Sequence, residues 1–114
     1  MSDFVELCRR GQVEKVRKAL GRGVNVNSKD EYSYTGLMSA ADFGHERVVE
    51  VLLHQPGIEV NHLAGGDTAL HKANDVNIVR RLLAMPGVEV EARDVLGRTP
   101  LMLAVRLNLS LIHI

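Results

Sequence analysis

The stretch TGLM at residues 35–38 recurs as TALH at residues 68–71 and as TPLM at residues 99–102. The copies are spaced by 33 and then 31 residues, which lies in the range of roughly 20 to 50 residues typical of stacked repeat units. One such unit cannot bury its apolar face alone, so neighbouring units must cover each other. We therefore expect the function to lie on a surface that several repeats build together.

The residues after the first copy follow a pattern of helix, turn, helix and loop. Apolar residues between positions 48 and 53 recur at the separations of three and four residues that mark a helix. Gly44 precedes this series and Pro56 follows it, so both ends of the second helix are marked by residues that interrupt helices. The same pattern fits the N-terminus, with a second helix predicted from residue 13 to residue 20.

The residue types of the repeated tetrapeptide suit the start of a helix. A threonine side chain can hydrogen-bond the backbone N–H groups that lack a partner there, and Pro100 lacks only an N–H group that would be unpaired in any case. Near the N-terminus, Asp3 stands three residues before Glu6, a spacing that resembles a capping box. The tetrapeptide leucines are expected to fill the layer between units: Leu37, Leu70 and Leu101.

The register predicts one domain over residues 1–114 with two irregular units. From the tetrapeptide leucine to the paired β-branched residues there are 11 positions in the second unit but 8 in the third, so the third lacks three residues at the corner between its helices. Its first helix must then either unwind or pull its partner helix nearer. The fourth unit stops after one helix and ends on apolar residues where a terminal unit needs a polar outer face, which predicts a fragment. The predicted repeats cover residues 2–29, 30–62, 63–93 (shortened) and 94–114 (incomplete).

These motifs resemble the ankyrin repeat. The stretch DVLGRTPL at residues 94–101 is similar to the opening of the ankyrin consensus, and GHERVVEVLL at residues 44–53 is similar to its second half. The resemblance covers essentially the whole chain and implies an all-α fold, an α-solenoid of helix-turn-helix units with projecting β-turn fingers. It also implies a protein-binding scaffold, usually without catalysis, whose concave face is formed by fingers and first helices. Several residues depart from the consensus: Gly36 and Ala69 replace proline, Met38 and Met102 replace histidine, and Leu63 replaces the leading aspartate.

The family's variable positions, carried onto this sequence, define the expected partner-binding surface. Eight of these positions are predicted to bind the partner, with Arg9 and Arg10 at the corner of the first unit: Glu31, Tyr32, Tyr34, Asp42, Phe43, Asp67, Leu96 and Arg98. Three of the four aromatic residues of the chain fall on this face, and tyrosine and arginine are over-represented among binding hot spots. The alternative interpretation is that these rings only cover the unit below them.

Composition and charge argue against several other classes of function. Fourteen basic and fourteen acidic residues cancel, so no net field favours nucleic acid or an acidic membrane surface. A single cysteine excludes an internal disulfide, and no N-terminal targeting pattern is present. The apolar C-terminal stretch is shorter than the roughly 20 residues of a membrane-spanning helix. We expect an intracellular protein, cytoplasmic or nuclear, without membrane insertion.

Neither metal nor catalytic chemistry is predicted. The five histidines lack a convincing spacing to acidic or thiol partners, and a closed zinc site needs about four ligands. Cys8 occupies an alanine-type position in the first helix and is interpreted as a buried core residue rather than a nucleophile. We expect no cofactor, no small-molecule substrate and no enzymatic activity. Two functions stay open: a protein-interaction module, or a regulatory or substrate-recruiting segment of a larger multidomain enzyme such as a ligase adaptor or kinase.

Overall fold

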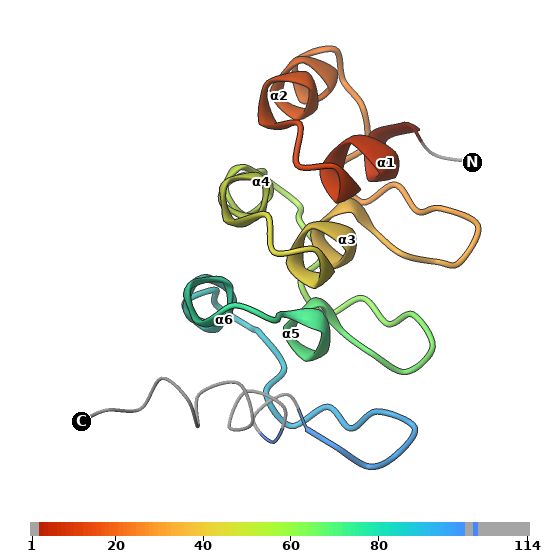
Figure 1. Cartoon of the computed structure of the whole chain (residues 1–114), viewed down its shortest axis with the longest axis vertical. Coiled ribbons are helices and arrows are strands. Elements are labelled where there is room, and N and C mark those ends of the chain that lie inside the picture. Colours follow the sequence, from red (N-terminus) through yellow and green to blue (C-terminus); the bar gives the residue numbers. More distant parts are fainter. Residues whose placement is uncertain (1–2, 100–101, 103–114) are drawn as a thin grey trace.

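The computed structural model describes residues 3–99 and residue 102. In this part of the chain the helices are α1 (Asp3–Arg9), α2 (Val13–Gly21), α3 (Gly36–Asp42), α4 (Glu46–Leu53), α5 (Ala69–Lys72) and α6 (Val76–Leu83). They form three pairs stacked along the long axis, with α1, α3 and α5 in one row and α2, α4 and α6 in another (Figure 1). Loops project sideways from the row of α1, α3 and α5. In the described residues, the predicted all-α solenoid of helix-turn-helix units with projecting loops is confirmed (Figure 1).

Thr35 and Thr68 stand at the starts of α3 and α5, as predicted. Oγ1 of Thr35 accepts a hydrogen bond from the backbone N–H of Met38 at 3.2 Å, and Oγ1 of Thr68 accepts one from His71 at 3.3 Å. Thr99 makes the same contact with Met102 at 3.3 Å. Each bond satisfies one of the N–H groups that a helix start leaves without a partner. The predicted roles of Pro100 and Leu101 lie outside the described residues.

The core lies between the two rows of helices and between successive units. Leu37 and Leu70 are both buried, as the tetrapeptide register predicts, and the second helices add fully buried side chains. These are Val16 from α2, Val48, Val49 and Leu52 from α4, and Ile78 and Leu82 from α6. Removing one such side chain from water is worth about 1.5 to 3 kcal/mol, so the stacking contacts supply the main stabilisation of each unit.

The close packing around position 36 explains why glycine stands there in place of proline. A β-carbon on residue 36 would lie 2.7 Å from Sγ of Cys8 and 3.2 Å from Cε2 of Phe4, both in α1. The Cys8 side chain is completely buried, and burial raises the pKa of its thiol to about 12. The first helix of the preceding unit therefore occupies the space that a larger residue at position 36 would need.

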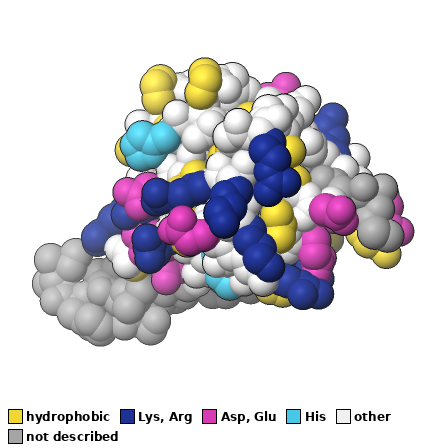
Figure 2. Space-filling view, turned by 90° about the horizontal axis from the view of Figure 1, so that it is seen from above, with side chains coloured by type: hydrophobic (Ala, Val, Ile, Leu, Met, Phe, Trp, Pro, Cys, Tyr) yellow, Lys and Arg dark blue, Asp and Glu magenta, His cyan; other side chains and the backbone are white. Residues whose placement is uncertain are grey.

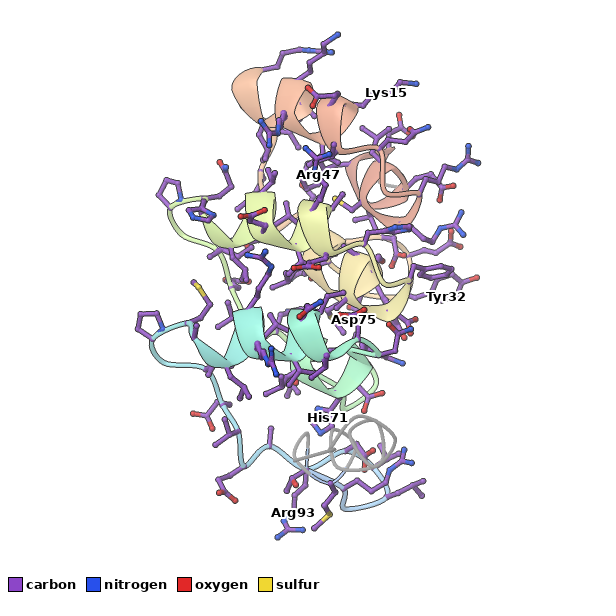
Figure 3. The ribbon with its side chains drawn as sticks, turned by 60° about the vertical axis from the view of Figure 1, so that its left-hand side comes forward. Lys15, Tyr32, Arg47, His71, Asp75 and Arg93 are labelled. Carbon is purple, nitrogen blue, oxygen red and sulfur yellow. The ribbon has the colours of Figure 1, made fainter. Side chains whose placement is uncertain are left out.

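The third unit accommodates its missing residues by ending the first helix early. Helix α5 has four residues where α3 has seven. Ala73 is extended, with ψ of 124°, and Asp75 then caps α6 by accepting hydrogen bonds from the N–H groups of Asn77 and Ile78 (Figure 3). Of the two expected responses to the missing residues, the structure shows the unwinding of the first helix. The repeat boundaries themselves stay a prediction, and the rest of the fourth unit lies outside the described residues.

Polar side chains tie each unit to the next at both ends of the helices. At the corner between paired helices, His45 Nε2 bonds to the carbonyl oxygen of Arg9 at 2.8 Å. One unit later, Asn74 Nδ2 donates to the carbonyl oxygen of Asp42 at 2.7 Å, so asparagine takes the place of the missing histidine. At the opposite end, Asn27 donates to the carbonyl oxygen of Gly57 at 2.8 Å and accepts from the N–H of residue 59. Asn61 repeats this pair of contacts one unit further along.

The end of the stack formed by α1 and α2 is polar. Figure 2 shows this end with Lys and Arg side chains over its centre and Asp and Glu side chains among them. Four residues of α2 contribute exposed charged side chains: Glu14, Lys15, Arg17 and Lys18. A polar outer face is what a terminal unit of a repeat array needs to stay in water.

Candidate functional site

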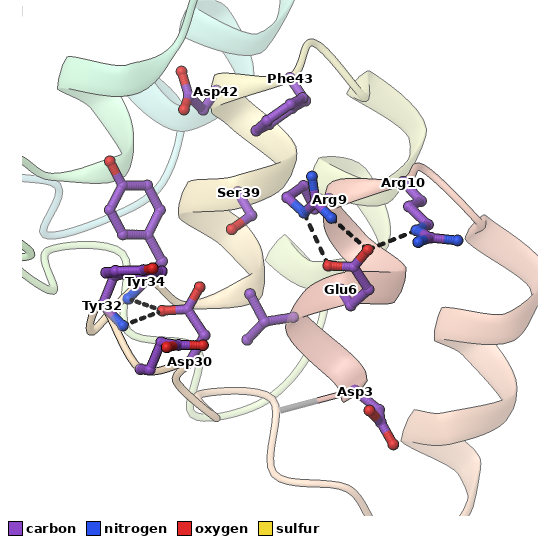
Figure 4. Close-up of a pocket in the computed structure, with 12 residues that line it drawn as sticks. Asp3, Glu6, Arg9, Arg10, Asp30, Tyr32, Tyr34, Ser39, Asp42 and Phe43 are labelled. Atoms are coloured by element: carbon purple, nitrogen blue, oxygen red, sulfur yellow. Dashed lines mark hydrogen bonds and ion pairs between the residues drawn. The ribbon is translucent and has the colours of Figure 1, made fainter. Parts of the chain in front are cut away.

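A groove of about 770 Å³ lies between α1, α3 and the loop at residues 30–34 (Figure 4). Its walls therefore come from two successive units. The residues that line it are Asp3, Val5, Glu6, Arg9, Arg10, Asp30, Glu31, Tyr32, Tyr34, Ser39, Asp42 and Phe43.

The groove has a buried floor and two walls of different chemistry. Ser39 of α3 is buried and lies between the walls. Tyr32 and Tyr34 stand on the loop side, whereas Glu6 and Arg9 stand on the α1 side (Figure 4). The C-terminal end of α3, with Phe43, closes one end. A segment lying in this groove would contact tyrosine rings and carboxylates on the loop side and the charged groups of α1 on the other side.

The loop at residues 30–34 is held in shape by Asp30. Its Oδ1 atom accepts hydrogen bonds from the backbone N–H groups of Tyr32 at 2.8 Å and Tyr34 at 3.0 Å. This Asx-type turn adds to the backbone hydrogen bonds of the loop, in which the N–H of Asp30 donates to the carbonyl of Tyr34 at 2.9 Å and the N–H of Ser33 donates to the carbonyl of Asp30 at 3.1 Å. Ser33 adopts a left-handed conformation with φ of 68°, and Lys29 pairs with Thr35 where the loop closes. The loop consequently directs Tyr32, which is 73% exposed, away from the stack (Figure 3).

The α1 wall carries a compact charge cluster around Glu6. Its carboxylate accepts hydrogen bonds from Nε of Arg9 at 2.9 Å and from Nε of Arg10 at 2.6 Å, and Nη2 of Arg9 also contacts it. These bonds, from Arg9 first and then Arg10, hold the pKa of Glu6 below its ordinary value. The predicted capping box between Asp3 and Glu6 is wrong, because Asp3 already lies in the helix and the Glu6 carboxylate is held by the two arginines instead.

Two rings of the groove are already in contact with cations of this chain. The guanidinium carbon of Arg9 lies 5.6 Å from the centroid of the Phe43 ring. Nζ of Lys72 lies 5.2 Å from the centroid of the Tyr34 ring and 3.3 Å from Oδ2 of Asp67. Contact with the Tyr34 side chain raises the pKa of Lys72, outweighing the opposite effect of burial. Lys72 thus joins Asp67 of the third unit to the loop of the second.

The electrostatic balance of the groove differs from that of the whole chain. The full sequence has equal numbers of acidic and basic residues. The groove is lined by five carboxylates against the two guanidinium groups of Arg9 and Arg10, a formal excess of three negative charges. The five carboxylates are Asp3, Glu6, Asp30, Glu31 and Asp42.

The eight residues expected to bind a partner divide into two groups. Five of them line the groove together: Glu31, Tyr32, Tyr34, Asp42 and Phe43. The other three are Asp67, Leu96 and Arg98, and they do not line it. Leu96 and Arg98 lie on the loop at residues 94–98, where Asp94 accepts hydrogen bonds from both backbone N–H groups at 3.0 and 2.8 Å. Nε of Arg98 also donates a hydrogen bond to Oδ2 of Asp94 at 2.8 Å, so the guanidinium group already has a partner within its own loop.

Five lining residues were not among the predicted positions or their flanking arginines: Asp3, Val5, Glu6, Asp30 and Ser39. The repeat register contains a signal for Asp30, because it organises its loop through the same two N–H contacts that Asp94 makes. The spacing of Glu6 from Arg9 and Arg10 is also a signal, since residues three and four apart meet on a helix. The first unit lacks the tetrapeptide, so the repeat register does not mark the residues of α1 as part of the site.

The histidines of the described part of the chain make structural contacts. His45 and His71 each bond through Nε2 to a backbone carbonyl oxygen of a neighbouring unit, at 2.8 and 3.0 Å. His62 bonds through Nε2 to the carbonyl oxygen of Ser33, in the loop of its own unit, at 2.9 Å. Within the described residues, no group of three or more histidine, cysteine, aspartate or glutamate side chains is placed to hold a metal ion. Among the helices of residues 3–99, none has the length and apolar character needed to cross a membrane.

The repeat pattern of this chain is similar to that of known proteins. Residues 4–53 match the family model described as "Ankyrin repeats (many copies)". The chain is 36% identical over 84 residues to BTB/POZ domain-containing protein 3 of Schizosaccharomyces pombe. It is 41% identical over 56 residues to osteoclast-stimulating factor 1 of Rattus norvegicus and 39% identical over 59 residues to an ankyrin repeat-containing protein of Saccharomyces cerevisiae. These alignments cover 72%, 49% and 49% of the chain but span only 16%, 26% and 12% of the three relatives.

Proposed function

Because this chain belongs to the ankyrin-repeat family, we propose that it is a protein-interaction module that binds a protein partner through its concave face of loops and first helices. Ankyrin repeats generally mediate contacts between proteins and are typically not catalytic. The proposed role for this chain is therefore recognition without chemistry, with no nucleic acid and no small-molecule substrate as partner.

The groove between α1, α3 and residues 30–34 is the observation that carries the proposal. It combines a buried floor with aromatic rings left in water, Tyr32 at 73% and Phe43 at 53% exposure. Large exposed rings cost solvation free energy in an isolated protein, and they concentrate at sites where a partner covers them. Tyrosine is also enriched among the residues whose truncation weakens binding most. These features support an interaction surface on this side of the stack.

We propose that the eight residues predicted from the sequence act as one extended surface with the groove at its centre. Glu31, Tyr32, Tyr34, Asp42 and Phe43 would form the central contact. Asp67 is linked to Tyr34 through Lys72 and would continue the surface along the stack. Leu96 is 72% exposed, and with Arg98 it would meet a partner long enough to reach the loop at residues 94–98.

Truncation of one exposed side chain on each face tests the proposal. Tyr32→Ala removes an exposed ring from the groove, while Leu83→Ala removes an exposed apolar side chain from α6 in the other row of helices. Both variants should fold as wild type, because neither side chain is buried. Proteins captured from cell extract by wild type should be lost with Tyr32→Ala and retained with Leu83→Ala. Loss with Leu83→Ala and retention with Tyr32→Ala would contradict a binding site on the concave face.

A second function is supported by the share of the relatives that the alignments cover. The chain spans 16% of the fission yeast protein and 26% of the rat protein. We propose, as the second candidate, that the chain is the regulatory or substrate-recruiting segment of a larger multidomain enzyme, such as a ligase adaptor or kinase. Sequencing the transcript on either side of this coding region distinguishes the two functions. An enzyme segment requires that the same open reading frame continue into a catalytic domain.

We also propose an intracellular location, cytoplasmic or nuclear. The single cysteine, Cys8, is a free and buried thiol, which suits a reducing compartment. Imaging of the tagged protein would test this, and secretion into the medium would contradict it.

A further inference from the structure

We propose that the groove between α1, α3 and residues 30–34 selects an extended basic segment of its partner, one that places an arginine or lysine side chain among the groove carboxylates. This inference rests on the proposed interaction function and names the chemistry of its partner. Three observations support it: the groove itself, the acidic side chains that lack partners among the described residues while the nearby cations are paired, and the exposed tyrosine ring beside them.

The acidic groups of the groove are partly unused. In the described part of the chain, the side chains of Glu31 and Asp42 make no hydrogen bond or ion pair, although both line the groove. Asp30 uses only its Oδ1 atom within the loop. A cation entering the groove could therefore bind to these carboxylate oxygens without breaking an existing hydrogen bond or ion pair. Charge-assisted hydrogen bonds of this kind are stronger than neutral ones.

The cationic groups near the groove are, by contrast, engaged. Arg9 and Arg10 both bond to the same Glu6 carboxylate. Lys72 bonds to Asp67 and lies over the ring of Tyr34. An acidic partner would have to break one of these pairs and would also face a formal excess of three negative charges. Like charges brought together in an interface act against binding, so the groove discriminates against acidic segments.

The rings of the groove are suited to the same ligand. Arg9 over Phe43 and Lys72 over Tyr34 show that two of these rings already have a cation within 6 Å. Tyr32 has no such partner among the described residues, and it follows Glu31 directly in the loop. The aliphatic stem of an arginine or lysine can cover a tyrosine ring while its charged head reaches a carboxylate. Tyr32 and Glu31 together therefore offer both contacts to one side chain.

The size of the groove indicates an extended segment rather than a folded surface. Its volume of about 770 Å³ falls within the range of roughly 300 to 1,000 Å³ of sites that enclose a ligand. A stretch of a few residues fits such a space, whereas a flat domain surface would leave the floor at Ser39 without contact. The occupant of the groove is therefore a tail or loop of the partner.

Selection from a library of short random peptides, displayed on phage, tests this inference on the full chain. The proposal expects selected peptides to be enriched in arginine and lysine relative to the unselected library. The lead peptide, labelled with a fluorophore, is then titrated by anisotropy at low and high salt. Binding should weaken with salt, and it should be about five-fold weaker to the double variant Glu31→Gln and Asp42→Asn.

A matched control separates the groove from net charge. Glu14→Gln with Glu91→Gln changes the charge of the chain by the same amount at exposed positions outside the groove, and it should bind the lead peptide as wild type does. Equal weakening in both double variants would overturn the inference, and so would selection of acidic or uncharged peptides. Tyr32→Ala separates failure of the basic ligand from failure of the proposed binding site. Non-basic peptides that depend on Tyr32 would refute the basic ligand alone, whereas failure to select any peptide that depends on Tyr32 would refute the groove as a binding site.

Discussion

Gly36 and Cys8 should behave as one packing unit, although 28 positions separate them in the sequence. Gly36→Ala adds a methyl group that would lie 2.7 Å from Sγ of Cys8, whereas ordinary contacts of this kind measure 3.4 to 4 Å. Both groups are buried, so the clash cannot be relieved by moving into water. Cys8→Ala removes the sulfur and so creates the space that the new methyl group needs.

The structure sets the size of each effect. Overpacking a buried site costs about 1 to 3 kcal/mol, and the better helix propensity of alanine returns up to about 1 kcal/mol. We therefore expect Gly36→Ala to lose about 1 to 2 kcal/mol of unfolding free energy. Cys8→Ala leaves a small cavity and should lose about 1 kcal/mol. The double variant should lose only about 1 kcal/mol, because Phe4 at 3.2 Å is then the single close neighbour.

Urea unfolding followed by far-ultraviolet circular dichroism measures these differences, because the signal reports the helices. Gly21→Ala is the matched control, since a β-carbon at that helical glycine meets nothing within 4 Å, and it should be neutral or stabilising. Losses that simply add, within about 0.5 kcal/mol, would refute the contact between residues 8 and 36. A Gly36→Ala variant more stable than wild type would refute it as well.

Three further predictions follow from the packing of the stack. Leu70→Ala should lose about 2 to 5 kcal/mol, because Leu70 is a buried tetrapeptide leucine; thermal unfolding identical to wild type would remove it from the core. Asn74→Ala should lose about 1 kcal/mol by freeing the Asp42 carbonyl, whereas Asn77→Ala, which keeps that bond, should lose less; equal losses in chemical denaturation would argue against the corner contact. The buried Cys8 thiol, with its pKa raised to about 12, stays protonated in the folded state while the unfolded thiol ionises above about pH 8.5. Stability should therefore fall by up to about 1.4 kcal/mol per pH unit above that pH relative to Cys8→Ala, and parallel pH profiles of the two proteins would contradict this.

The stack could be predicted from the sequence because its signals are local and repeat. Threonine at a helix start and leucine two residues later have the same environment in each unit, so one correct alignment places Thr35 with Thr68 and Leu37 with Leu70. The count of missing residues in the third unit likewise requires only the register.

Contacts between units were harder to predict, because they depend on the distance and rotation between successive helix pairs. The replacement of the corner histidine by Asn74 is an example, since nothing local marks this asparagine as the residue that reaches the Asp42 carbonyl. The α1 wall of the groove is another. The ring of Phe43 meets Arg9 only because α1 and the end of α3 are stacked side by side. For the same reason Leu96 and Arg98, assigned to the same face, lie apart from the groove residues.

Site-specific photocrosslinking in cells is the most direct test of the central claim that the groove is where a partner binds. A photoreactive phenylalanine derivative is introduced at position 32, on the groove loop, or at position 15, an exposed site on α2 (Figure 3). The account predicts a discrete crosslinked adduct from position 32 that is absent or much weaker from position 15. Adducts of equal yield from both positions, or an adduct from position 15 alone, would contradict it.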